Sequence, residues 1–279
     1  MQQQPPKAYK DMEFLNSPAS RHVRILCEYE EPRQRLMRYG VHHTVVFFGS
    51  ARTKSSQDAS AQLAAVKERI AQHPDPKDPV LLNELRKAEV SQRMSGYYDA
   101  ARELSRKLTS WSLDREGGRK YLVCSGGGPG IMEAANRGAS DVPGGRSVGL
   151  GISLPFEQGV NMYVTPELAF EFHYFFTRKL WFLYPCKAMV IFPGGFGTLD
   201  ELFEALTLIL TGKIKKRLPV VMFGHRDYWS RVINLEAMAE FGTVSPEDLK
   251  LIHFTDDVDE AFDYLARELE LAENAGETS

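Results

Sequence analysis

The chain alternates short apolar runs with longer amphipathic segments, and this order constrains its fold more than any other feature. Strand-like runs lie at residues 44–48, 120–124, 147–153, 188–192, 218–223 and 251–254. Helix-like segments lie at residues 130–140, 167–184, 198–212, 227–240 and 257–272. Strands that alternate with helices form a mostly parallel sheet with right-handed crossovers and with helices on both faces. We therefore expect an α/β protein with a single doubly wound, mostly parallel sheet of the Rossmann-like kind.

Three of these strands end in turns made of glycine and other small residues. The turns are residues 193–201 (PGGFGTLDE), residues 125–130 (SGGGPG), and Gly49 with Ser50. Glycine lets backbone N–H groups approach an anion, and the N-terminus of a following helix attracts negative charge. In open parallel sheets, ligands bind outside the carboxyl ends of the strands. One such turn is a weak signal, but three in one sheet favour a pocket for a nucleotide or a phosphorylated sugar.

Carboxylates in the turn at 193–201 indicate more than phosphate binding. Thr198 can cap the following helix or donate its hydroxyl to a phosphate oxygen. Asp200 and Glu201 follow closely, and anion binding alone does not favour carboxylates there. They therefore suggest chemistry or contacts with sugar hydroxyls. For Asp200 a second interpretation is equally good, namely a negative charge in the first turn of a helix. The same two interpretations apply to Glu133, which could supply a second carboxylate to the site or a first-turn helix charge.

The core of the chain fits one domain with two additions. Residues 1–40 form an N-terminal extension, and residues 41–279 form a Rossmann-like nucleotide-binding domain. Within that domain, about residues 53–110 contain helix-like segments broken at 73–79 (HPDPKDP). This crossover is longer than a usual βαβ connection. We interpret it as a helical insertion that packs on the sheet, packs on another subunit, or extends into solvent.

Composition and charge exclude several function classes. The formal net charge is −3, which does not indicate a nucleic-acid-binding surface. No apolar run reaches the roughly 18 residues of a membrane-spanning helix, and the N-terminus lacks a signal pattern, so we expect a cytoplasmic protein. The cysteines Cys27, Cys124 and Cys186 are too dispersed for a disulfide framework or a metal cluster. We expect no metal and no resident cofactor.

Residues 126–134 (GGGPGIMEA), the run TRK at 177–179 and residues 193–201 occur in a specific order and spacing. Together they resemble the Lonely Guy family of cytokinin-activating phosphoribohydrolases, whose bacterial relatives cleave nucleoside 5′-monophosphates. The likeness covers roughly residues 42–225, and residues 208–213 (LILTGK) resemble the longer bacterial branch. The resemblance implies hydrolysis of the N-glycosidic bond of AMP or a cytokinin riboside monophosphate. The products would be a free base and ribose 5-phosphate.

The resemblance also implies which residues act. Glu201 matches the last residue of the family's PGGxGTxxE motif, and its carboxylate would stabilise positive charge on the ribose in an oxocarbenium-like transition state. Arg178 matches the family's catalytic arginine and would bind phosphate or polarise the departing base. The implied substrate-binding residues are Gly49, Ser50, Gly127, Gly128, Met132, Lys179, Gly194, Gly195, Gly197, Thr198 and Asp200. Adjacent helical positions diverge by about 100°, so we expect only one residue of the Arg178–Lys179 pair to face the pocket.

Two other functions compete with hydrolysis. A non-catalytic nucleotide or molybdenum-cofactor carrier could use the same fold, although a carrier does not need both Arg178 and Glu201. A lysine decarboxylase, a label attached to relatives of this family, would need a Schiff-base lysine for pyridoxal phosphate, and Lys179 beside Arg178 does not suggest one. The resemblance further implies a homodimer or larger homo-oligomer, with the aromatic run at 170–181 as a candidate interface. The expected partner is an AMP-like small molecule, without nucleic acid or membrane.

Overall fold

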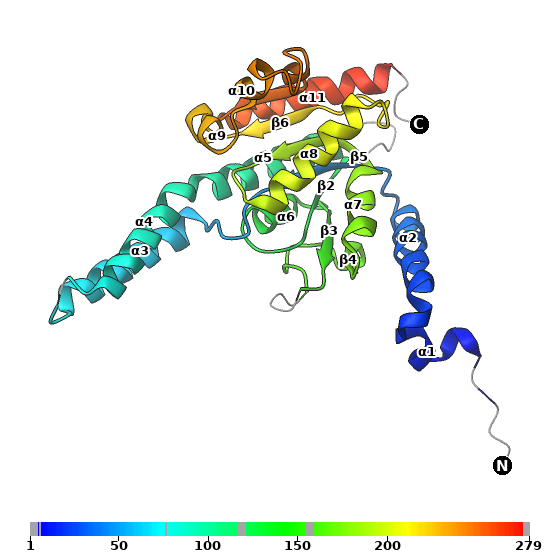
Figure 1. Cartoon of the computed structure of the whole chain (residues 1–279), viewed down its shortest axis with the longest axis horizontal. Helices are drawn as coiled ribbons and strands as arrows, with labels where there is room; N and C mark the ends of the chain where they lie inside the picture. Colours follow the sequence, from blue (N-terminus) through cyan, green and yellow to red (C-terminus); the bar gives the residue numbers. More distant parts are fainter. Residues whose placement is uncertain (1–4, 6, 76, 116–120, 155–158, 276–279) are drawn as a thin grey trace.

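The computed structural model describes residues 5, 7–75, 77–115, 121–154 and 159–275. These residues form a seven-stranded sheet in the order β4-β3-β2-β1-β5-β6-β7 (Figure 1). All neighbouring strands are parallel. The α/β, doubly wound fold expected from the sequence is confirmed.

The strands alternate with helices along most of the chain. The strands are β1 His43–Phe48, β2 Tyr121–Ser125, β3 Ser147–Ile152, β4 Ala169–Phe172, β5 Cys186–Ile191, β6 Val220–Phe223 and β7 Ile252–Thr255. The α-helices are α1 Met12–Asn16, α2 Arg21–Arg38, α3 Ser56–Gln72, α4 Pro79–Met94, α5 Gly96–Leu113, α6 Ile131–Ser140, α7 Phe175–Leu183, α8 Phe196–Leu210, α9 Arg226–Val232, α10 Leu235–Glu240 and α11 Val258–Asn274.

Each face of the sheet has its own hydrophobic core, because successive strand residues point to opposite faces. On one face, Phe48 of β1 belongs to a cluster with Trp181 of α7, and α2 and α8 join the same layer. On the other face, Phe47 clusters with Leu104 of α5 and Leu265 of α11, and α6 completes that layer. The helices therefore hold the central strand β1 from both sides.

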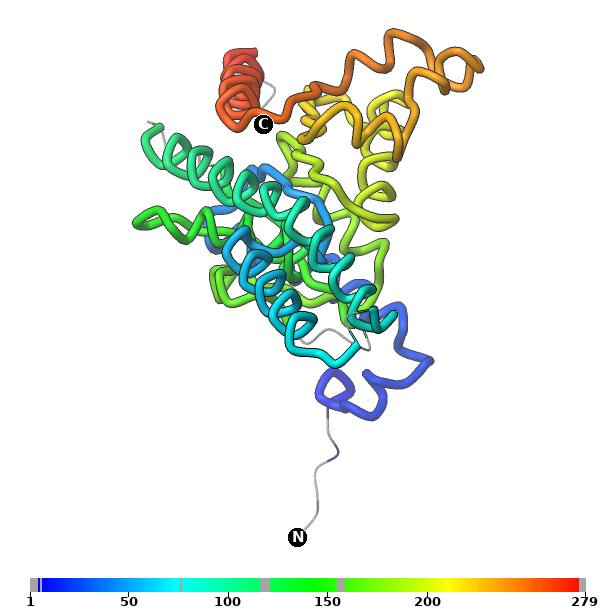
Figure 2. The backbone as a smooth tube through the Cα atoms, turned by 90° about the vertical axis from the view of Figure 1, so that its left-hand side faces the viewer, coloured from blue at the N-terminus to red at the C-terminus, as the bar shows by residue number. Residues whose placement is uncertain are grey.

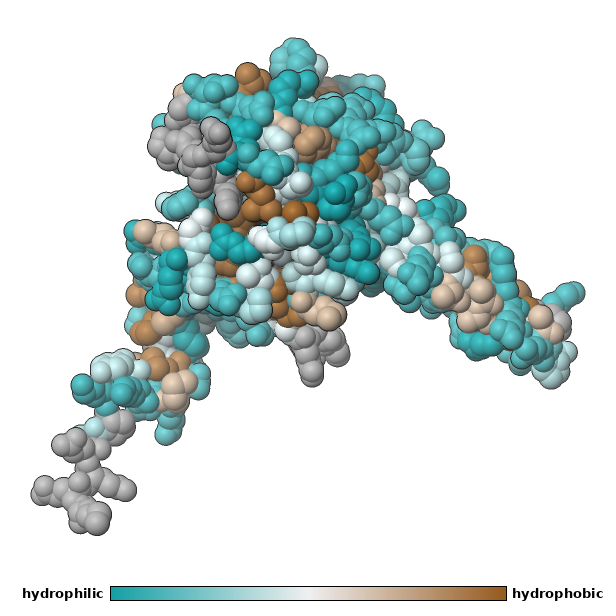
Figure 3. Space-filling view, turned by 180° about the vertical axis from the view of Figure 1, so that it is seen from behind, coloured by the Kyte–Doolittle hydropathy of each residue, from teal (hydrophilic) through white to brown (hydrophobic). Residues whose placement is uncertain are grey.

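Helices α3 and α4 form a hairpin that projects from the body of the protein as an arm (Figures 1 and 2). The arm's surface is mixed in hydropathy (Figure 3), and its exposed apolar side chains include Val80, Leu82 and Val90. In contrast, α5 packs on the sheet, in the hydrophobic core that contains Phe47. Of the residues 53–110 expected as an insertion, only the hairpin projects. The division of the chain into an extension, a domain and an insertion stays a prediction.

The helix expected at residues 167–184 is wrong in its first half. A short 3-10 helix and then β4 occupy this stretch, and α7 begins only after them. Within β4, Phe170 and Phe172 are buried whereas Glu171 between them is exposed, which is the two-residue alternation of a strand. Four residues are too few for this alternation to stand out from the aromatic run that follows.

The single helix expected at residues 227–240 is two helices, α9 and α10. The backbone becomes extended at Ile233, with φ of −142°. The side chain of Asn234 then accepts a hydrogen bond from the N–H of Ala237 at 2.9 Å, so it caps α10. The capping residue Asn234 therefore separates the two helices, and the apolar periodicity on both sides of it led to the prediction of one continuous helix.

Candidate active site

A cavity of about 590 Å³ lies at the carboxyl ends of β1, β2 and β5. The chain runs outward from β1 through β2, β3 and β4 and then returns to β5 on the other side of β1. β1 and β5 therefore flank the topological switch point of the sheet, where ligands of open α/β sheets bind. The sequence-predicted residues that line the cavity are Gly49, Ser50, Gly128, Met132, Arg178, Gly195, Gly197, Thr198 and Glu201.

Backbone hydrogen bonds join the three glycine-rich turns around this cavity. The N–H of Ser50 donates to the carbonyl of Pro193 at 3.0 Å, and the N–H of Ile131 donates to the carbonyl of Ser50 at 3.1 Å. Gly130 adopts a φ of +71°, and a Cβ there would lie 2.3 Å from the carbonyl oxygen of Ser50. The turn after β1 is thus fixed between the other two.

Replacing Gly130 by alanine is expected to destabilise the protein by about 2 kcal/mol more than replacing Gly144. Both glycines have positive φ, so both substitutions introduce backbone strain. A Cβ on Gly144 would meet no atom within 4 Å, whereas a Cβ on Gly130 would overlap the backbone of Ser50, which adds an overpacking cost. Urea unfolding of the two variants measures the difference. Equal losses would contradict the close packing of these turns.

The N-terminus of α8 forms the part of the cavity best suited to a phosphate. Gly195 is the N-cap residue and provides no side-chain cap. A Cβ on Gly195 or Gly197 would meet nothing within 4 Å, whereas one on Gly194 would lie 2.1 Å from the hydroxyl of Thr198. Gly194 therefore lets the turn close against Thr198. The helix dipole and the first N–H groups of α8 then favour an anion.

Glu201 lies one turn further along α8, and its side chain is only 4% exposed. Burial raises the pKa of its carboxyl group to about 7, although the positive charges of Lys179 and Arg178 act in the opposite direction. Lys179 Nζ lies 3.5 Å from one carboxylate oxygen, and Arg178 Nη2 lies 3.9 Å from the other. A carboxyl group with this pKa can exchange a proton near neutral pH, as a general base requires.

Arg178 extends from α7 into the cavity. Its guanidinium carbon lies 5.2 Å from the ring centre of Phe175 and 5.4 Å from that of Phe182. The aromatic rings therefore confine a cation beside Glu201. A guanidinium group in this position can bind a phosphate or stabilise negative charge on a departing base.

Lys179 extends in a different direction from its neighbour. Its ammonium group lies 2.9 Å from Asp200, 2.7 Å from Glu204 and 3.5 Å from Glu201. Lys179 and Asp200 line a neighbouring groove rather than the cavity, and the Asp200 side chain is 59% exposed. Arg178 is thus the member of the basic pair that faces the ligand space. Lys179 acts on Glu201 through its charge.

Gly127 shapes the site without lining it, and an asparagine that the sequence did not indicate holds its turn. The Asn161 backbone N–H donates to the Gly127 carbonyl at 2.6 Å. The Asn161 side-chain amide lies within 3.1 Å of the carbonyls of Gly127 and Gly128 and of the side-chain oxygen of Asn136. Asn161 is separated from the glycine motif by a helix and a strand, so no local pattern connects them.

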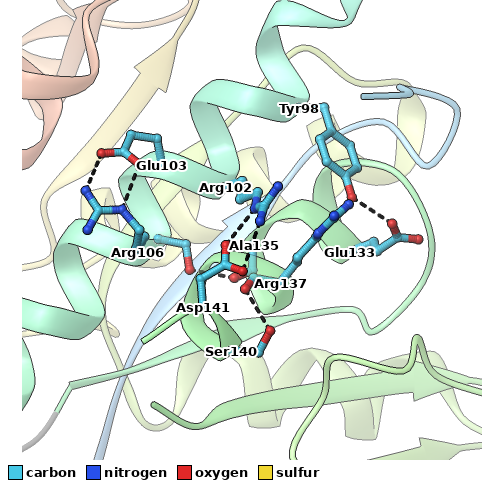
Figure 4. Close-up of polar contacts among 10 residues, drawn as sticks. Tyr98, Arg102, Glu103, Arg106, Glu133, Ala135, Arg137, Ser140 and Asp141 are labelled. Atoms are coloured by element: carbon cyan, nitrogen blue, oxygen red, sulfur yellow. Dashed lines mark hydrogen bonds and ion pairs between the residues drawn. The ribbon is translucent and has the colours of Figure 1, made fainter. Parts of the chain in front are cut away.

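Glu133 does not supply a second carboxylate to the cavity. It accepts a hydrogen bond from the hydroxyl of Tyr98 at 2.7 Å, across the interface of α5 and α6 (Figure 4). Burial and this hydrogen bond raise the pKa of Tyr98 to about 12, so the phenol remains a donor at neutral pH. An ion pair also joins Arg102 of α5 to Asp141, the C-cap residue of α6, at 2.6 Å.

The side chains that line the cavity and that the sequence prediction missed include Arg52, Phe175 and Phe196. Each lies near a motif: Arg52 closely follows the turn after β1, and Phe196 is the first variable position of the PGGxGTxxE motif at residues 193–201. Phe175 precedes Arg178 by one helical turn. The Phe196 ring is 94% exposed, so it stands at the mouth of the cavity. Spacing from the motifs could have identified all three.

Sequence comparison connects this cavity with known proteins. A family model described as "Possible lysine decarboxylase" matches residues 132–265. Cytokinin riboside 5′-monophosphate phosphoribohydrolase LOG3 of Arabidopsis thaliana is 29% identical over 165 residues, covering 57% of this chain and 70% of the relative. A probable enzyme of the same description, LOGL3 of Oryza sativa subsp. japonica, is 29% identical over 167 residues, covering 56% and 69%. The resemblance to the Lonely Guy family is confirmed.

The segment matched by the family model contains Met132, Arg178 and residues 193–201, whereas the turn after β1 precedes it. The cavity brings both parts together. Among the described residues, no group of three or more His, Cys, Asp or Glu side chains is placed to hold a metal ion. Within the same part of the chain, no helix has the length and apolarity needed to span a membrane.

Proposed function

We propose that this chain hydrolyses the N-glycosidic bond of a nucleoside 5′-monophosphate. The substrate is AMP or a cytokinin riboside monophosphate, and the products are the free base and ribose 5-phosphate. The observation that carries the proposal is the buried Glu201 carboxyl group beside Arg178, in a cavity that also contains the anion-binding start of α8. The names of the phosphoribohydrolase relatives support the same reaction.

In the proposed mechanism, the phosphate binds the N-terminus of α8 and the ribose lies toward Glu201. The bond between C1′ and the base nitrogen breaks, and its electron pair leaves with the base. Ionised Glu201 stabilises the positive charge that develops on the ribose and accepts a proton from the water that attacks C1′. Arg178 stabilises negative charge on the base or phosphate. The departing base takes up one proton from solvent and Glu201 releases the proton that it accepted, so the net reaction consumes one water.

A non-catalytic carrier is the second candidate, because the N-terminus of α8 would bind a nucleotide without any reaction. The confined pair of Glu201 and Arg178 favours the enzyme, since binding alone gains nothing from a buried carboxylate near a phosphate. The description of the family model suggests a decarboxylase instead. That chemistry needs a lysine amine in the pocket, and the described residues that line the cavity include no lysine.

We also propose that the chain assembles as a homodimer through α7 and α8. The support is the set of exposed apolar side chains on these helices and at the C-cap of α7, Phe176, Leu180, Tyr184 and Leu210. A single species at the monomer mass in sedimentation velocity would contradict this assembly. A cytoplasmic location stays a prediction from the sequence.

The proposed reaction is tested by incubating the purified chain with AMP and, separately, with isopentenyl-AMP. Chromatography of the free base and an enzymatic assay of ribose 5-phosphate should show the two products in equal amounts. The two rates would rank the bases. Tight AMP binding in calorimetry without base release would instead favour the carrier. The absence of both binding and release would exclude adenine nucleotides as ligands.

A further inference from the structure

The N-terminal helix α2 contacts the helix that bears Arg178. The Glu28 carboxylate accepts hydrogen bonds from the backbone N–H groups of His173 at 2.8 Å and Tyr174 at 3.3 Å. It also lies 2.5 Å from the hydroxyl of Thr177. These partners are the last residues before α7 and a residue in its first turn. Glu28 therefore caps α7 from a helix about 145 residues earlier in the chain.

Without Glu28, α7 would have no side-chain cap. Its own N-cap residue is Tyr174, which makes no side-chain capping hydrogen bond. The exposed N–H groups at the start of a helix need partners, and the positive end of the helix dipole favours a carboxylate. Glu28 supplies the carboxylate, and it accepts a hydrogen bond from the N–H of the N-cap residue Tyr174. Its loss would leave the N–H groups of His173 and Tyr174 without this acceptor, whereas the Thr177 hydroxyl would keep the Tyr174 carbonyl at 2.8 Å.

A second set of contacts fixes α7 on the other side of Arg178. The indole N–H of Trp181 donates to the backbone carbonyl of Glu28 at 3.0 Å. The rings of Tyr29 and Trp181 also lie 6.1 Å apart between centres. Thr177 and Trp181 thus both bond to Glu28 of α2, and Arg178 lies between them in the sequence. These contacts determine both the position and the rotation of α7 at Arg178.

Arg178 depends on this placement. Its side chain leaves α7 for the cavity, where the guanidinium group lies 3.9 Å from Glu201 at the edge of ion-pair contact. A small rotation of α7 would move it away from Glu201 or turn it toward the groove that contains Lys179. Displacements of about 1 Å can change rates by about a hundredfold in preorganised sites.

We propose that Glu28 is a positioning residue for the reaction: it caps α7 from the N-terminal extension and so holds Arg178 against the cavity. This inference rests on the proposed function. Glu28 lies outside residues 132–265, the segment that the family model matches, so the inference gives the N-terminal extension a role in the active site. Glu28 itself touches neither the cavity lining nor Arg178, so its effect passes through the backbone of α7.

The test compares Glu28→Gln and Glu28→Ala with Glu30→Ala, each in the full-length protein. Glu30 is an exposed glutamate of the same helix whose partner is Arg33, so its removal controls for lost charge on α2. We expect kcat for base release to fall about tenfold in both Glu28 variants, with the larger loss for alanine. We expect Glu30→Ala to retain the wild-type kcat.

A double-mutant cycle separates positioning from general destabilisation. In an Arg178→Lys background, Glu28→Ala should lower kcat much less than it does in the wild type. The Arg178 guanidinium group that Glu28 is proposed to position is already absent from that background. Hydrogen exchange should also show faster exchange at the His173 and Tyr174 amides in Glu28→Ala. If Glu28→Ala lowers kcat equally in both backgrounds, or leaves the kcat of an active protein unchanged, this inference is overturned and the proposed function stands. A wild type that releases no base would overturn the proposed function and this inference with it.

Discussion

Replacing Glu201 by glutamine is expected to lower kcat for base release by about a thousandfold. Glutamine keeps the size of the side chain but can neither accept a proton from water nor stabilise a cation with a full negative charge. The phosphate site at the start of α8 is unchanged, so KM should change little. Initial rates of base release, measured by chromatography with AMP, give both parameters.

Glu204→Gln is the matched control for this prediction. Glu204 lies on the same helix, and its carboxylate contacts Lys179 at 2.7 Å, but it lines the neighbouring groove rather than the cavity. Its replacement removes one negative charge near Lys179 without touching the proposed reaction centre. We expect activity within a few-fold of the wild type. Similar losses in Glu201→Gln and Glu204→Gln would assign the effect to the charge of this helix and not to catalysis.

The same Glu201→Gln substitution is expected to stabilise the protein at alkaline pH. Burial raises the pKa of Glu201 to about 7 from the usual 4.5, so the folded state disfavours the ionised form. Below pH 4.5 the carboxyl group is neutral in both states and carries no such cost. As the pH rises from 4.5 to 7, the unfolded chain releases this proton first, and stability falls by about 3 kcal/mol. Glutamine remains neutral throughout and avoids this loss.

The advantage of Glu201→Gln over the wild type should therefore be about 3 kcal/mol larger at pH 8 than at pH 4. Urea unfolding at the two pH values measures it, and taking the difference between them removes any pH-independent effect of the amide. Activity should show the complementary behaviour, with kcat/KM of the wild type falling below about pH 7. A stability difference that does not vary with pH would show that Glu201 ionises normally in the folded protein.

Much of this architecture could be predicted from the sequence because the signals are local. Apolar runs such as β1 and β5 are buried completely, and each is followed by a glycine turn that leads toward the site. Once the strands are parallel, their carboxyl ends meet at one edge, so Gly49, Gly128 and Thr198 converge without any long-range information. Glu201 lies on a helix expected from the same pattern, and Arg178 lies in the second half of the helix expected at residues 167–184, the half that the structure confirms.

The features that the sequence did not predict depend on contacts between distant residues. β4 is recognisable only through its pairing with β3, since a four-residue strand has little periodicity of its own. Asn161 and Glu28 act on turns and helices far away in the chain, and a polar side chain in a helix or loop carries no sign of its partner. Asp200 likewise lines the groove that contains Lys179 rather than the cavity, and its place in the motif does not reveal this.

The position of β5 beside β1 has a consequence for how the protein is made. β1 emerges from the ribosome long before β5, and Glu28 precedes its partner Thr177 by 149 residues. At ordinary rates of translation this interval is on the order of ten seconds. Once β2 has been synthesised, β1 has one neighbouring strand while its other edge stays unpaired until β5 follows, and Glu28 of α2 has no helix to cap. The proposed active site therefore cannot form before the chain has been synthesised as far as Glu201. An unpaired strand edge can pair with other chains, so this interval, before the protein has any activity, is the one in which aggregation competes with folding.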